Sequence, residues 1–302
     1  MKKLIILLVV IFTMGTFALD VNMNVQGSVG FALDVDAKAA QDQSFGDVRP
    51  TFMIKKGDTT LYWMPKTSAS TLVDYMFVDT MTGLGMLRVG LQRIGLANNV
   101  AGPYATSTFL LGAVQKGTGM GIATKIAGMT TRITLLGNMW LLDDGTANTA
   151  TNKASLSALV DLGVFGVKVG GVYNVDNTSG ATKNGLSGYV EAKQMMAGMT
   201  VAGAAFIDLS DDAAAASLCN YLSQTKARRL VQAYVAYPLG AVELRGSYTT
   251  DLNKATIDNE IIGAVKYALS PEVNAWFTYT MSKAAGGAET KSGVVSVEFL
   301  VI

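Results

Sequence analysis

The chain has 302 residues, of which 50% are hydrophobic and 16% charged, and its 24 basic and 23 acidic residues leave a formal charge of +1. A near-neutral molecule lacks the basic field that attracts nucleic acid, so no nucleic-acid partner is predicted. The chain has no histidine and a single cysteine, Cys219. These counts exclude an imidazole base, an intramolecular disulfide and a four-ligand zinc site. We predict no enzymatic activity, no cofactor and no metal site.

The N-terminus has the parts of an export signal. Lys2 and Lys3 are followed by an apolar run from Leu4 to Phe12, and a small-residue cleavage site ends at Ala18. A transmembrane anchor is the alternative, but the run is about half of the ~20 residues that a spanning helix needs. We therefore expect a signal peptide at 1–18 and one exported domain at 19–302.

Beyond the leader, apolar and polar residues alternate with a period of two. The segment from Val21 to Val35 has one apolar and one polar face. It is longer than the about 5 or 6 residues of an ordinary strand and suits a tilted membrane-spanning strand, which needs about 9 to 11. Further strands are predicted at 48–56, 59–64, 73–80, 86–94, 106–114, 120–127, 130–141, 154–162, 167–173, 186–194, 199–209, 226–237, 241–250, 257–269, 273–282 and 292–302.

Tight turns and longer polar loops alternate between these strands. A polar stretch at 36–47 is predicted as a loop, and the glycines from Gly117 to Gly121 as part of a hairpin turn at 116–119. The long loop 210–225, which contains Cys219, folds into the interior or lies outside; the sequence leaves both open. In the C-terminal half, turns near Val164, Ala197, Pro238 and Pro271 alternate with loops near Thr146, Ser179, Ala214, Asn253 and Gly286.

This alternation predicts an all-β fold, a transmembrane antiparallel up-and-down β-barrel of about 16 strands, within a range of about 14 to 18. The segments number 17, but single-chain bacterial barrels have even counts, so the excess is expected between Thr106 and Leu141. A soluble sandwich, with its apolar face inward, is the alternative. The export signal, the long strands and a mean hydropathy of +0.32 favour the barrel.

Alternation assigns an apolar face to lipid and a charged face to the interior, because a basic residue at mid-membrane on the lipid face would cost about 2 to 4 kcal/mol. Glu191 with Lys193, and Glu243 with Arg245, either form a constriction or simply pair in water. The interior charges nearly balance, which predicts weak ion selectivity. They include four basic residues, Arg49, Lys55, Arg88 and Lys125, and four acidic ones, Asp34, Asp74, Asp161 and Asp258. The predicted pore-lining residues are Arg49, Arg88, Arg132, Lys168, Glu191, Lys193, Asp208, Arg228, Glu243, Arg245, Lys266 and Glu298.

The leader, the alternating strands and the terminal segment from Gly293 to Ile302 resemble those of Gram-negative outer-membrane porins. Members usually end on an aromatic residue, whereas here Phe299 lies three residues before the end. The resemblance implies a water-filled channel for passive diffusion of small hydrophilic solutes and ions, surrounding outer-membrane lipid, insertion by the barrel-assembly machinery, and a homotrimer. The alternatives are a closed structural barrel acting as an anchor or adhesin, a transporter of hydrophobic compounds, and a soluble exported protein.

Overall fold

The structure is a computed structural model that describes residues 20–34, 39–65, 75–95, 114–140, 153–176, 183–209, 229–254 and 257–301. Within these ranges, the side chains at 26–34, 39–49, 93–95, 114–116, 138–140, 153, 176, 183 and 301 are outside the description. The expected signal peptide at 1–18, the loop 210–225 and the predicted pore residue Arg228 also lie outside it, so these predictions stay predictions.

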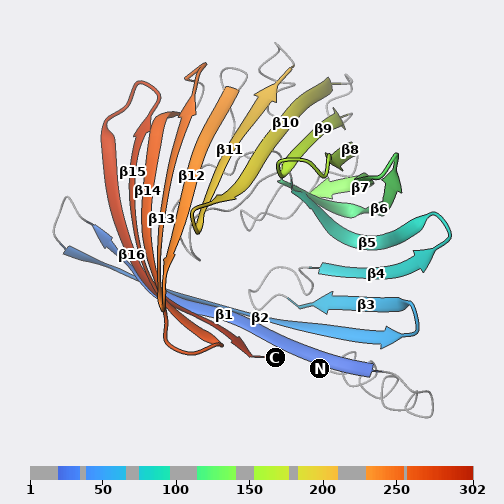
Figure 1. Ribbon diagram of the computed structural model, residues 1–302, viewed down its shortest axis with the longest axis horizontal. Coiled ribbons are helices and arrows are strands. Elements are labelled where there is room, and N and C mark those ends of the chain that lie inside the picture. Colours follow the sequence, from blue (N-terminus) through green and yellow to red (C-terminus); the bar gives the residue numbers. More distant parts are fainter. Residues whose placement is uncertain are drawn as a thin grey trace.

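Sixteen antiparallel strands form one closed barrel in the described part of the chain (Figure 1). Each strand pairs with its neighbours in sequence, and β1 pairs with β16 to close the ring. The predicted all-β up-and-down barrel is confirmed. The strands are β1 (Asp20–Asp34), β2 (Ala39–Lys56), β3 (Thr59–Met64), β4 (Tyr75–Thr82), β5 (Gly85–Gly95), β6 (Val114–Ile126), β7 (Met129–Trp140), β8 (Lys153–Asp161), β9 (Val167–Asp176), β10 (Lys183–Met196), β11 (Met199–Asp208), β12 (Arg229–Leu239), β13 (Val242–Asp251), β14 (Ile257–Ala268), β15 (Val273–Ala284) and β16 (Glu289–Val301).

The barrel has a turn end, where β2 connects to β3, and a loop end, where β1 connects to β2. Two-residue turns such as Ala127-Gly128 and Ala197-Gly198 lie at the turn end, with the positive φ values that tight hairpins require. As predicted, the connections near Val164, Ala197, Pro238 and Pro271 lie at the turn end, although Pro238 belongs to β12 and its turn is Gly240-Ala241. Those near Asn253 and Gly286 lie at the loop end, but the connections 269–272 and 285–288 are equally long, so length does not alternate there. The loops predicted near Thr146, Ser179 and Ala214 lie outside the described residues. No helix among the described residues is long and apolar enough to span a membrane.

Strand β6 corrects the N-terminal half of the prediction. It runs without a break from Val114 to Ile126, so the turn predicted at 116–119 is wrong. Residues 106–113 lie outside the described residues, and the barrel closes without a strand there because β5 pairs directly with β6. The sequence predicted 17 strands and the barrel has 16. The extra predicted strand therefore lies between Thr106 and Leu141, where the error was expected.

The glycines of β6 serve close packing between strands. A β-carbon built on Gly119 would collide with the carbonyl oxygen of Leu135 and lie 2.8 Å from the Cα atom of Leu136. Across the other edge, Gly119 pairs with Gly90, which has a φ of 135° that side chains rarely adopt. Glycine within a strand often marks such a close approach of two backbones. The same residue is also typical of turns, which is why the sequence pattern was interpreted as a turn.

The loop predicted at 36–47 is also wrong. Strand β2 begins at Ala39 and pairs with β1 as far as Asp34, with a register shift between Phe31 and Leu33. The backbone hydrogen bonds between β1 and residues 39–47 of β2 form independently of the side chains there. The alternation signal fails here because most of the residues between Ala39 and Asp47 are small or polar.

Candidate functional site

The register identifies the inner and outer faces of the barrel, because directly opposed residues on neighbouring strands share a face. On one face, Phe206, Leu230 and Trp276 are at most 4% exposed although the sheet has a single layer. On the other face, large apolar side chains such as Val231 and Val235 remain about two-fifths exposed. The first face is therefore the inner wall and the second is the outer surface.

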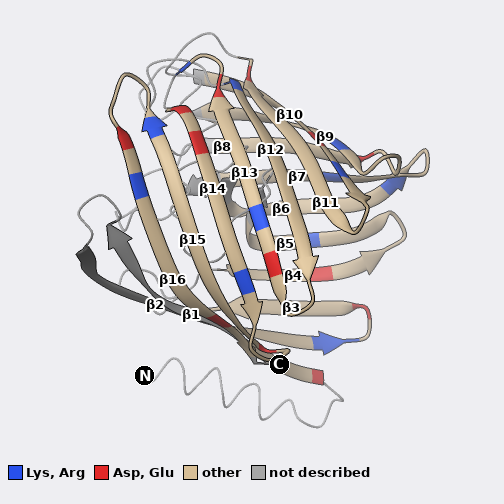
Figure 2. Ribbon diagram, turned by 60° about the vertical axis from the view of Figure 1, so that its left-hand side comes forward, with Lys and Arg blue, Asp and Glu red and all other residues tan. Residues whose placement is uncertain are grey.

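Charged residues are sparse along the strands (Figure 2). In the described part, those away from the strand ends lie on the inner wall, whereas outward-facing ones such as Arg229 and Lys283 lie near the loop end. Arg49 pairs with Gln26 across the sheet, but its side chain is not among the described ones. Arg228 is outside the described residues. The register places on the inner wall the other residues predicted to line a pore, which are Arg88, Arg132, Lys168, Glu191, Lys193, Asp208, Glu243, Arg245, Lys266 and Glu298.

Trp276 organises a cluster of charges on the inner wall of β13 to β16. The Arg245 guanidinium lies 4.7 Å and the Lys266 ammonium 5.6 Å from the centroid of its ring, within cation–π range. The indole Nε1 donates to Glu298 Oε2 at 3.0 Å, and Arg245 donates to Glu243. Two cations and two carboxylates therefore balance one another around one buried ring.

We expect Trp276→Phe to lower the free energy of unfolding by about 1.5 kcal/mol, the scale of a hydrogen bond to a charged group. Phenylalanine keeps an aromatic face for the two cations but has no donor for Glu298. The measurement is denaturant unfolding in lipid vesicles. Trp276→Phe combined with Glu298→Gln should cost less than the sum of the two single changes; strict additivity would contradict the coupling.

A second ion pair joins β4 and β5 on the inner wall. Arg88 donates from Nε and Nη2 to the two carboxylate oxygens of Asp79, both at 2.7 Å. The guanidinium also lies 3.9 Å from the centroid of the Phe77 ring, which stacks on Tyr62. Bidentate pairing fixes Arg88 in place and neutralises it. Sequence reasoning selected Arg88 but not Asp79, its partner across the strands.

Glu191 and Asp208 are buried on the inner wall. Tyr189 donates its hydroxyl to Glu191, and the Lys168 ammonium is 3.9 Å from the same carboxylate. Ser187 donates to Asp208 at 2.9 Å. In the described part of the chain, the ion-pair partner of Glu191 is thus Lys168 rather than the predicted Lys193, because Lys168 lies directly across the strands.

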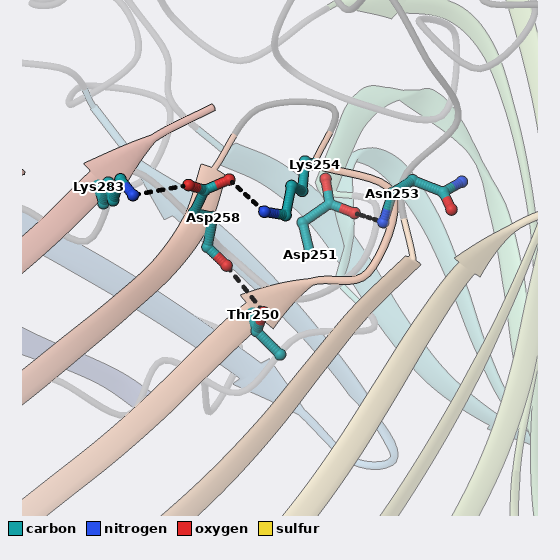
Figure 3. A network of polar contacts seen from close by, with 6 residues as sticks. All are labelled: Thr250, Asp251, Asn253, Lys254, Asp258 and Lys283. Carbon is teal, nitrogen blue, oxygen red and sulfur yellow. Dashed lines mark hydrogen bonds and ion pairs between the residues drawn. The ribbon is translucent and has the colours of Figure 1, made fainter. Parts of the chain in front are cut away.

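Asp258 is not an interior charge, which corrects its predicted place. It is the extra residue of a bulge at the loop end of β14, between Ile257 and Asn259. Its carboxylate lies 3.2 Å from the ammonium of Lys283 and 3.6 Å from that of Lys254, and its carbonyl accepts from Thr250 at 2.8 Å (Figure 3). Lys283 stands on the outer face, so this network belongs to the outer rim of the barrel. A bulge breaks the period of two on which the prediction relied.

Part of the inner wall is apolar, which sequence reasoning missed. Val172, Tyr189, Phe206 and Leu230 form one buried cluster across β9 to β12. Their inward positions in the alternation were the available signal, but the charged neighbours dominated the assignment. In the described part of the chain, no group of three or more histidine, cysteine or acidic residues is placed to hold a metal ion.

Comparison with solved structures shows the fold. A loop-deletion mutant of OmpT, an outer membrane protein of Vibrio cholerae, matches with a TM-score of 0.64 and 11% identity over 94% of this chain and all of that one. A substituted Rh. blastica porin matches with a TM-score of 0.61 and 14% identity over 93% of this chain and all of its own. The chain has the porin fold.

A third match to this porin fold is an anion-selective porin from Comamonas acidovorans, with a TM-score of 0.61 and 10% identity over 94% of this chain and all of that chain. No protein-family model matches the chain. No curated protein sequence matches it either. At these identities the likeness establishes the architecture alone.

Proposed function

We propose that the protein is an outer-membrane porin, a water-filled channel through which small hydrophilic solutes and ions diffuse passively. The observation that carries the proposal is that the outer face of the closed barrel exposes large apolar side chains, whereas the charged residues in the middle of the strands face the interior. A sixteen-stranded barrel is wide enough for an aqueous channel. Lipid around the outer face satisfies the exposed apolar side chains, and water satisfies the inner charges.

The proposed channel is weakly selective among monovalent ions. On the inner wall, Arg88 is neutralised by Asp79, and the Trp276 cluster contains as many carboxylates as cations. Paired charges contribute little field beyond a Debye length, which is about 8 Å at physiological salt. A passive channel of this kind needs no catalytic residues.

Location, assembly and oligomeric state complete the proposal. An outer-membrane barrel would be exported through the N-terminal signal peptide at 1–18 and inserted by the barrel-assembly machinery. Porins of this size are commonly trimers, which supports a homotrimer as the assembled form. The apolar outer face would then be shared between lipid and neighbouring subunits.

Planar-bilayer recording of the purified full chain tests the channel. Stable, reproducible conductance steps in KCl are expected, with a reversal potential close to zero under a salt gradient. Vesicles containing the protein should swell in small sugars and lose this response as the sugar grows. Silence in both assays would contradict the channel and favour the alternative, a closed structural barrel that acts as an anchor or adhesin.

A further inference from the structure

Four cations gather near the turn end of the inner wall, on β6 to β10. Lys125, Arg132, Lys168 and Lys193, here called the turn-end cation strip, all share the inward face. The register places Lys125, Thr130, Asp161 and Lys168 opposite one another on successive strands, which are about 4.8 Å apart. The strip therefore occupies one continuous sector of the wall.

Lys168 and Lys193 are near neighbours within the strip. Lys193 donates its backbone N–H to the carbonyl of Gly166 at 3.3 Å, and Gly166 precedes Lys168 by two residues. The Lys193 side chain is exposed and the Lys168 side chain is 41% exposed, and the register puts both residues on the inward face. Like charges on neighbouring strands repel, and the nearby Glu191 offsets only the charge of Lys168.

The carboxylates of this sector are already engaged. Asp161 accepts the backbone N–H of Gly163 at 2.9 Å, which fixes it in the β8–β9 turn. Glu191 is buried and accepts from Tyr189, while Lys168 stands 3.9 Å away, at the limit of an ion pair. Among the described residues, four cations against two carboxylates leave the sector positive, whereas Arg88 and the Trp276 cluster are balanced.

We propose that the turn-end cation strip is a binding station for small multiply charged oxyanions, such as inorganic phosphate or citrate. An anion with two or more negative oxygens contacts the Lys168 and Lys193 ammonium groups together and removes their repulsion, which a monovalent anion does less well. Arginine and lysine groups lining a channel select anions in this way. The inference rests on the proposed function, because solutes reach the strip through the aqueous interior.

Isothermal titration calorimetry of the full chain in detergent tests the station. Inorganic phosphate and citrate are each expected to bind saturably, and acetate to bind much more weakly. The double variant Lys168→Gln/Lys193→Gln should weaken binding of both anions by at least about tenfold. Lys254→Gln/Lys283→Gln removes the same charge from the outer rim and should leave the affinity unchanged.

Binding that is absent in the unaltered protein, or that weakens equally in both double variants, overturns the station. Circular dichroism and heat-dependent gel mobility confirm that each variant forms the barrel before it is titrated. Conductance in KCl without phosphate or citrate binding would retain the channel and overturn the station. Saturable binding without conductance would retain the station and overturn the channel.

Discussion

Ala205→Lys is expected to lower the free energy of unfolding in lipid vesicles by about 2 to 4 kcal/mol. Ala205 lies in the middle of β11 on the outer face, between Val190 and Val231, which are 43% and 41% exposed. In a membrane those neighbours contact lipid, and a lysine at this depth must bring its ammonium group into hydrocarbon or distort the bilayer. The measurement is reversible denaturant unfolding of the reconstituted protein.

Ala204→Lys is the matched control, since it makes the same change one residue earlier on the inner face. Ala204 lies opposite Glu191 and Gln232, so a lysine there meets a carboxylate and the interior. Because Ala204 also packs against the buried cluster of the inner wall, we expect a penalty of about 1 to 2 kcal/mol, smaller than that at Ala205. A larger penalty at 204 than at 205 would reverse the two faces and support the soluble sandwich.

The faces of the barrel could be predicted from the sequence because alternation depends only on the geometry of a strand. Lys168 and Val169, or Gln232 and Val231, point to opposite sides whatever surrounds them. The even strand count, and the placing of successive connections at opposite ends of the barrel, follow from closing a sheet through hairpins. To predict these features it was sufficient to know whether each residue is polar or apolar and where it stands in the chain.

The residues that meet across neighbouring strands could not be predicted, because the register depends on how two strands align and not on either strand alone. Lys168 rather than Lys193 meets Glu191, since β9 and β10 pair at that level. Trp276 was not selected at all, because a tryptophan at an inward position carries no charge to mark it. The bulge that moves Asp258 to the rim likewise depends on the fit of β14 against β15.

The close contact between Gly119 and β7 is another cross-strand feature that the sequence did not reveal, and it predicts a second large change in stability. Gly119→Ala is expected to lower the free energy of unfolding by about 3 kcal/mol, the upper part of the range for overpacking. The added methyl group meets backbone atoms of Leu135 and Leu136, which cannot move aside as a flexible side chain would. The β6–β7 ladder must then separate or shift its register.

Gly263→Ala is the matched control, because Gly263 also lies within a strand and its added β-carbon would have nothing within 4 Å. It is expected to change the free energy of unfolding by less than about 0.5 kcal/mol. Denaturant unfolding and the yield of heat-modifiable barrel report both variants, so Gly119→Ala remains measurable even if little of it assembles. Equal stability of the two variants would contradict the close approach of β6 to the backbone of Leu135 and Leu136.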